Sequence, residues 1–187
     1  MLTAILERFE AEVNKYDAVL FSDYGKGSLA HISKMIDLAR VAGKAVLIDP
    51  KGDDWARYRG ATVITPNVSE FAQVVGRWAS EEQLRKKAEG VCAELGLGAL
   101  LVTRSEEGMT LFENDRVTSI PAETREVSDV TGAGDTVIAV LSVMVACGLD
   151  LFQAMTFANQ AAGIVVGKLG TASLSYDELY QFCANRY

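Results

Sequence analysis

Short apolar runs alternate with amphipathic helical segments along most of this chain, and that alternation limits the folds it can adopt. Buried strands are predicted at residues 18–22, 45–48, 61–64 and 99–102. Helices are predicted at 2–16, at 29–41, directly after Asn67 and at 81–95. Strands that alternate with helices usually pair in parallel, with the helices packed on the sheet. The sequence therefore predicts an α/β fold, a mainly parallel sheet flanked by helices on both faces.

The pattern changes in the second half of the chain. Residues 109–121 alternate over short runs around Asn114-Asp115, which predicts a hairpin at the edge of the sheet. Three helices are expected after it, at 133–147, 151–168 and 175–185. Because no repeat, low-complexity tract or Pro- or Ser-rich linker interrupts the pattern, we expect residues 1–187 to form a single domain.

The composition argues against several classes of binding partner and site. A net charge of −7 argues against a nucleic-acid-binding surface, and the apolar runs are too short for a transmembrane span. The N-terminal residues lack the pattern of a secretory signal, and the three cysteines contain no CxxC pair. With His31 as its one histidine, the chain cannot form a histidine-rich metal site. We expect a cytoplasmic protein with reduced cysteines and neither a nucleic acid nor a membrane as partner.

A glycine-rich turn before the first of the three C-terminal helices carries the strongest chemical signal. Residues 127–136 read VSDVTGAGDT. Gly132 and Gly134 allow a tight turn whose N–H groups can bind an anion at the positive end of the helix dipole. Asp135 would repel that anion, but it is well placed to take a proton from a hydroxyl that attacks phosphorus. The segment indicates phosphoryl transfer to an alcohol; the alternative is a tight turn with an acid in the first helical turn.

The string Asp129-Val-Thr-Gly-Ala-Gly-Asp-Thr136 resembles the C-terminal signature of the ribokinase-like (phosphofructokinase-B) carbohydrate kinases. The resemblance implies that Asp135 is the catalytic base and that the backbone of Gly132, Ala133 and Gly134 forms the anion hole. It also implies ATP and a sugar or sugar phosphate as substrates.

A second motif follows the strand predicted at 61–64. Thr65-Pro-Asn-Val-Ser-Glu70 resembles the Asn-x-x-Glu motif of the same family. By that resemblance, Asn67, Val68, Ser69 and Glu70 support the nucleotide phosphates, and Glu70 holds Mg²⁺ through water, which suits a hard cation. The alternative is a helix N-cap with an acid in the first turn.

Further resemblances concern the nucleotide and a monovalent cation. The turn after residue 102 is similar to the nucleotide-contacting turn of the family, which implies that Thr103, Ser105 and Gly108 lie near phosphate or ribose. Asn159 would lie by the adenine, although the small residues around it would serve helix packing equally well. In several family members the loop matching 167–173 encircles a cation with carbonyls matching Asp129 and Thr131, so K⁺ binding is an open expectation.

Among the branches of the family, the heptose 7-phosphate kinases are the most similar. The strings that carry this likeness are Ser22-Asp-Tyr-Gly-Lys-Gly27, Ile48-Asp-Pro-Lys-Gly52, Thr103-Arg-Ser-Glu-Glu-Gly108 and Val165-Val-Gly-Lys-Leu-Gly-Thr171. Lys26 and Lys51 in these loops either meet a substrate phosphate or are solvated. The resemblance implies phosphorylation of the anomeric hydroxyl of a heptose 7-phosphate, in the route to lipopolysaccharide core.

Kinases of this family begin with further strands, a sugar-binding glycine pair and a small β-sheet lid, which we expect to precede the region seen here. Two classes of function follow. The chain either supplies the nucleotide site and base of a kinase, completed by an N-terminal segment, or it is a nucleotide-binding or structural module without catalysis. As a macromolecular partner we expect either a second copy of the chain or that complementing N-terminal segment. Within the first class, another sugar is the alternative substrate.

Overall fold

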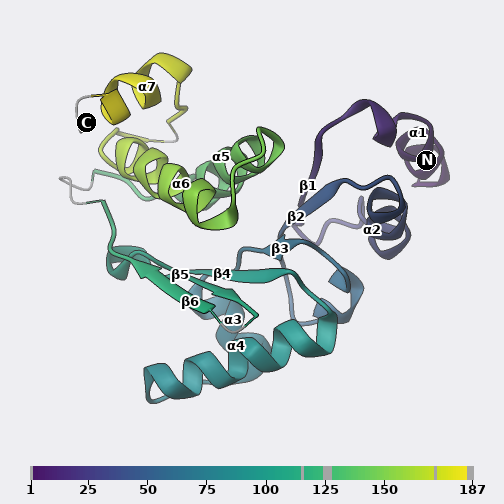
Figure 1. The fold of residues 1–187 in the computed structure, drawn as a ribbon, viewed down its shortest axis with the longest axis horizontal. Coiled ribbons are helices and arrows are strands. Elements are labelled where there is room, and N and C mark those ends of the chain that lie inside the picture. The colour runs from purple at the N-terminus through teal and green to yellow at the C-terminus, as the bar shows by residue number, and fades with distance from the viewer. Residues whose placement is uncertain (1, 115, 124–127, 171, 185–187) are drawn as a thin grey trace.

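A six-stranded sheet forms the centre of the protein (Figure 1). The computed structural model describes residues 2–114, 116–123, 128–170 and 172–184. The strands follow one another across the sheet in chain order. They are β1 (Ala18–Ser22), β2 (Ala45–Asp49), β3 (Val63–Ile64), β4 (Ala99–Thr103), β5 (Met109–Glu113) and β6 (Arg116–Ile120). β1 to β4 are parallel, whereas β5 and β6 form an antiparallel hairpin, which confirms the predicted class and the hairpin.

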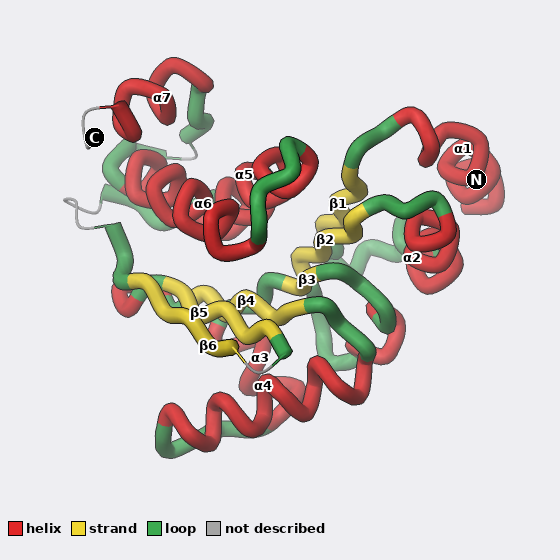
Figure 2. The backbone as a smooth tube through the Cα atoms, in the orientation of Figure 1, coloured by secondary structure: helices red, strands yellow, loops and turns green. Residues whose placement is uncertain are grey.

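Helices cover both faces of the sheet, giving three layers (Figures 1 and 2). One face carries α1 (Leu2–Glu12), α2 (Ile32–Val41), α3 (Val68–Val75) and α4 (Glu81–Leu95). The other carries α5 (Ala133–Ala146) and α6 (Leu151–Val166), and α7 (Tyr176–Ala184) packs on α6. None of the described helices is long and apolar enough to cross a membrane.

The central strands β2 and β4 are apolar over most of their length, and each of their faces is buried in a separate core. In β4, Leu100 and Val102 face the α1–α4 layer, while Leu101 between them faces α5 and α6. In β2, Ile48 and Leu47 divide in the same way. These side chains have no exposed surface, which is the burial expected for parallel strands between two helical layers.

Some predicted boundaries were wrong by a few residues. The helix expected from residue 29 begins at Ile32, because the preceding residues form a turn in which the Ile32 N–H donates to the Leu29 carbonyl (3.1 Å). β3 begins at Val63 and not at Ala61, whose N–H donates to the Tyr58 carbonyl (3.1 Å) in the preceding loop. Residues 115, 127, 171 and 185, which belong to predicted motifs or elements, lie outside the described residues.

β1 lies at one edge of the sheet. Within the described part of the chain it pairs on one side with β2, and Leu20 on this edge strand remains 37% exposed. An edge strand offers unpaired backbone groups to another chain or segment. Pairing along β1 through a second copy or a complementing segment therefore stays a prediction.

Gly108 connects β4 to β5 in a conformation that only glycine adopts easily. Its φ is +90°, and a Cβ there would lie 2.1 Å from the Ile120 carbonyl oxygen. We expect Gly108→Ala to lower the free energy of unfolding by more than about 1 kcal/mol, measured by urea titration. Gly90 in α4 has open space around the same position, so Gly90→Ala should instead stabilise the protein by about 0.5–1 kcal/mol. Equal stability of the Gly108→Ala variant and the parent would contradict this account.

Candidate active site

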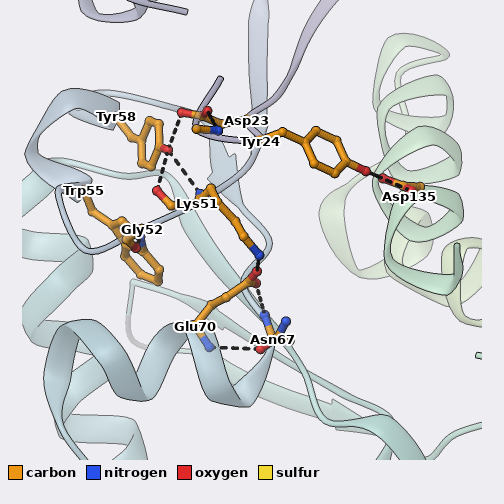
Figure 3. Close-up of polar contacts among 10 residues, drawn as sticks. Asp23, Tyr24, Lys51, Gly52, Trp55, Tyr58, Asn67, Glu70 and Asp135 are labelled. Carbon is orange, nitrogen blue, oxygen red and sulfur yellow. Dashed lines mark hydrogen bonds and ion pairs between the residues drawn. The ribbon is translucent and has the colours of Figure 1, made fainter. Parts of the chain in front are cut away.

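The polar motifs gather at the edge of the sheet where the parallel strands end, as ligand sites of open α/β sheets do. Asp23 and Tyr24 follow β1, and Asp49 is the last residue of β2. Lys51 lies two residues after Asp49, and Glu70 lies in the first turn of α3, after β3 (Figure 3). Because Ser22 pairs with Asp49 in the parallel register, the loops after β1 and β2 lie side by side.

The glycine-rich turn forms the N-terminus of α5. Gly132 is the N-cap with φ +82°, a left-handed conformation, and its carbonyl accepts a hydrogen bond from Thr136 Oγ1 (2.9 Å). Nothing lies within 4 Å of the position that a Cβ of Gly134 would occupy. A surface hollow of about 280 Å³ lies beside the turn, lined by Gly132, Asp135, Thr136, Ala139, Val140, Ala172 and Leu174. The turn therefore has the conformation and the open space that an anion-binding helix N-terminus requires.

Asp135 is exposed in the first turn of α5, and its carboxylate faces the loop after β1. The phenol of Tyr24 donates to both of its oxygens, at 3.0 Å to Oδ1 and 3.2 Å to Oδ2 (Figure 3). This hydrogen bond and the carboxylate charge raise the pKa of Tyr24 above 10.0. The contact joins residues that are 111 positions apart in the sequence.

Asn67 and Glu70 form a capping box at the start of α3. Asn67 Oδ1 accepts from the Glu70 N–H (2.9 Å), and Glu70 Oε2 accepts from the Asn67 N–H (3.0 Å). The structure therefore confirms the helix N-cap that the sequence offered as the alternative role of this motif. The other oxygen of Glu70 accepts from Lys51 Nζ at 3.0 Å (Figure 3), and this bond raises the pKa of Lys51. Val68 and Ser69 complete the first turn of the helix.

The carboxyl group of Asp49 is affected by the charges of both Glu70 and Asp135. Its pKa is raised from 3.8 to about 6, chiefly by burial and then by the charges of Glu70 and Asp135. The attraction of Lys51 partly offsets these effects. The strand-end edge is therefore rich in negative charge, a property that suits a site for cations or for phosphates carried with cations.

The turn after β4 lies next to the α3 N-terminus. The Thr103 N–H donates to the Pro66 carbonyl (3.0 Å), and Thr103 bridges to Asn67 in parallel fashion. Ser105 has φ +51°, a conformation that non-glycine residues seldom adopt. The structure thus brings the Thr103–Gly108 turn and the Asn67 motif together.

Asn159 has a structural contact of its own. It is 8% exposed on α6, and its Nδ2 donates to the Pro121 carbonyl (2.9 Å) after β6. The expected position of Asn159 beside adenine stays a prediction, and the amide group is committed to a backbone partner.

The segment proposed for K⁺ is ordered by local hydrogen bonds. The Thr131 N–H donates to Asp129 Oδ1 (2.8 Å), and hydrogen bonds from the Thr131 side chain and backbone lower the pKa of Asp129. The Ser128 and Asp129 N–H groups both donate to the Val166 carbonyl at the end of α6. This leaves the role of the Asp129 and Thr131 carbonyls as a prediction.

Within the described ranges, no three His, Cys, Asp or Glu side chains are grouped so that they could hold a metal ion directly. A divalent cation at Glu70 would therefore depend on water and on the phosphates it accompanies. A larger hollow of about 780 Å³ lies at the opposite edge of the sheet, between α4 and β5, and is lined by residues including Cys92, Leu97 and Phe112. It contains none of the predicted site residues.

Comparison with known proteins identifies the family. Residues 2–178 match the model of the pfkB family of carbohydrate kinases. This chain belongs to the pfkB family. Among its relatives, the Bifunctional protein HldE of Histophilus somni is 53% identical over 176 residues, and that of Chromohalobacter salexigens is 54% identical over 177. Each match covers 94% of this chain, which spans 37% of the length of each relative.

Solved kinases share the fold. The ribokinase of Arabidopsis thaliana, complexed with ribose and ATP, superimposes with a TM-score of 0.83 at 22% identity, covering 94% of this chain and 58% of its own. Phosphofructokinase-2 of Escherichia coli, in complex with potassium, gives 0.79 at 18% identity, covering 96% and 61%. At these identities the likeness establishes the ribokinase-like fold of this pfkB chain.

The sequence analysis did not single out two residues that the structure places at the candidate site. Tyr24 and Asp49 belong to strings that were considered for their lysines, Lys26 and Lys51. Asp49 is the last residue of a parallel strand, a position from which it could have been predicted to lie at the site. Tyr24 gave a weaker signal, because its partner Asp135 is distant in the sequence and the contact depends on how α5 packs beside β1.

The raised pKa of Asp49 predicts a dependence of stability on pH. Between about pH 4 and 6 the folded state binds more protons than the unfolded state, so the free energy of unfolding falls as the pH rises through this range. We expect Asp49→Asn to lose this dependence and to melt several degrees above the parent at pH 7, in thermal unfolding without divalent cations.

Glu178 provides a control of opposite sign. Lys168 and Ser175 lower the pKa of Glu178 to about 2, so stability from this pair is lost as the pH falls from about 4.5 to 2. Glu178→Gln should therefore differ from the parent at pH 7 more than at pH 2, although solvent screening keeps the effect small. Parallel pH profiles for the parent and Asp49→Asn would contradict the account of Asp49.

Proposed function

We propose that this chain forms the ATP site and supplies the catalytic base of a sugar-phosphate kinase. The acceptor is a heptose 7-phosphate, D-glycero-β-D-manno-heptose 7-phosphate, phosphorylated at its anomeric hydroxyl. The observation that carries the proposal is the exposed Asp135 carboxylate directly after the left-handed Gly132 turn, at the N-terminus of α5. Membership of the pfkB family and the heptose-kinase-like strings support the choice of reaction and acceptor.

In the proposed reaction Asp135 takes the proton of the sugar hydroxyl as its oxygen attacks the γ-phosphorus. The backbone N–H groups of Gly132, Ala133 and Gly134 stabilise the charge that develops on the transferred group. The nucleotide phosphates lie along the Asn67–Glu70 motif and the Thr103–Gly108 turn. Mg²⁺, held through water by Glu70, would neutralise phosphate charge, and the carbonyls of Asp129 and Thr131 would hold K⁺ behind the turn.

The first test is nucleotide binding by the chain itself. We expect MgATP and MgADP to bind and to raise the melting temperature, since a ligand at about 100 times its Kd stabilises a fold by about 2.7 kcal/mol. Titration calorimetry with Mg²⁺ measures the affinity. Absence of both heat and a melting shift at millimolar nucleotide would refute the proposed ATP site.

Two glycines provide a matched pair of variants. Gly134 and Gly90 both lie in helices with open space at the Cβ position, so Asp fits sterically at either. Gly134→Asp places a negative charge in the proposed anion hole and should weaken nucleotide binding at least about tenfold, or about 1.4 kcal/mol. Gly90→Asp on α4 should leave the affinity unchanged.

The second test concerns the base. With the chain joined to the sugar-binding segment expected from the family, Asp135→Asn should lower kcat by at least about a hundredfold, since a positioned base contributes about 10²–10⁴. Nucleotide affinity should stay within a few fold or rise, because a like charge is removed. Asp177→Asn, which changes an acid in the first turn of α7, is the control and should keep the parent rate. Near-parent turnover by the Asp135→Asn enzyme would make Asp135 a structural residue.

A further inference from the structure

The phenol of Tyr24 holds the Asp135 carboxylate in a bifurcated hydrogen bond. One O–H lies 3.0 Å from Oδ1 and 3.2 Å from Oδ2, so it sits between the two oxygens (Figure 3). Among the described residues, Tyr24 is the side chain that donates hydrogen bonds to this carboxylate. Because Asp135 is exposed, little packing restricts its rotation.

Packing does not explain why Tyr24 lies there. Tyr24 is 56% exposed, and Lys26 Nζ lies 5.7 Å from the ring centroid. A ring with so much exposed surface gains little from burial. The hydroxyl contact is therefore the main interaction that directs Tyr24 towards α5.

The backbone that carries Tyr24 is held firmly. The neighbouring Asp23 is 5% exposed and accepts hydrogen bonds from the Gly25 N–H (2.8 Å) and from the fully buried Tyr58 phenol (2.8 Å). Arg57 pairs with the same carboxylate at 3.6 Å. The turn after β1 is thus fixed to the core on one side, while Tyr24 extends from it to Asp135 on the other.

The contact leaves room for a substrate. A carboxylate has about four lone-pair positions, and one bifurcated donor uses the two that face each other. The outer position of each oxygen stays available to a sugar hydroxyl. Tyr24 itself cannot replace the base, because its raised pKa keeps the phenol protonated at neutral pH.

We propose that Tyr24 is a positioning residue of the kinase reaction, whose O–H holds the Asp135 carboxylate in the orientation that accepts the sugar hydroxyl proton. The inference rests on the proposed role of Asp135 and adds a residue that acts through it. A base must lie within hydrogen-bond reach of the proton it takes, and a small misplacement of a reacting group lowers the rate strongly. Loss of the O–H should therefore affect kcat and leave substrate binding nearly unchanged.

The first arm of the test asks whether the contact exists in solution, and it needs no activity. In the chain labelled with [¹³Cζ]tyrosine, the Tyr24 resonance is assigned by its absence in Tyr24→Phe. We expect Tyr24 to titrate above the ordinary midpoint of 10.0 in the parent and closer to that value in Asp135→Asn. Identical titration of Tyr24 in both proteins would overturn the proposal.

The second arm measures turnover in the chain joined to its sugar-binding segment. Tyr24→Phe keeps the ring and removes the O–H, so kcat should fall about tenfold, which is less than the loss of the base itself. KM for both substrates should stay within about twofold. Tyr16→Phe is the matched control, because Tyr16 is 54% exposed and precedes β1 at the opposite end of the strand; it should keep the parent kcat.

The outcomes separate this inference from the proposed function. If the parent and Tyr24→Phe turn over at the same rate, the positioning role is wrong and the kinase proposal stands. If KM rises while kcat is retained, Tyr24 is a substrate contact and the positioning role is again wrong. If the joined parent protein has no turnover, the proposed function fails, and the role of Tyr24 in it fails as well.

Discussion

The buried carboxylate of Asp23 is the interaction on which the strand-end site depends. An unpaired charge with 5% exposure would be strongly destabilising, but Asp23 receives hydrogen bonds from Tyr58 and Gly25 and pairs with Arg57. Tyr58 also accepts from the Lys51 N–H at 3.2 Å, and burial raises its pKa, so that it remains a donor. One carboxylate thereby fixes the turn after β1 to the loop after β2, and with them the starting points of Tyr24 and Lys51.

Parallel pairing then gathers acids at one edge. Asp49, Glu70 and Asp135 come from β2, α3 and α5, yet each influences the same region, as the raised pKa of Asp49 indicates. Such an arrangement is unfavourable unless cations or donors balance it. Lys51 and Tyr24 serve that purpose in the structure, one at Glu70 and the other at Asp135. A site of this kind is suited to ligands that bring positive charge with them, as Mg-nucleotides do.

Local signals made most of the fold predictable. α4 begins after Ser80, whose hydroxyl accepts from the Gln83 N–H, and ends at left-handed Gly96, so its sequence contains both of its boundaries. The first residues of α2 and β3 were less predictable, because the turns before them also contain apolar residues, which resemble the start of the helix or strand. The glycine motif located Asp135, and the Asn67 motif located Glu70. The contacts of these acids with Lys51 and Tyr24 were not predicted, since both depend on tertiary packing between separate segments.

The Asn67–Glu70 motif has a structural and a candidate functional role at once. Glu70 Oε2 accepts from the Asn67 N–H in the capping box, while Oε1 faces Lys51. A hydrated cation at Oε1 would compete with the Lys51 ammonium and leave the capping box intact. Lys51, 54% exposed at its side chain and attached to the loop that Tyr58 fixes, would then be free to meet a phosphate that arrives with the cation. The helix start therefore holds Glu70 in place through one oxygen, and exchange at the other oxygen would let the same motif contribute to both stability and binding.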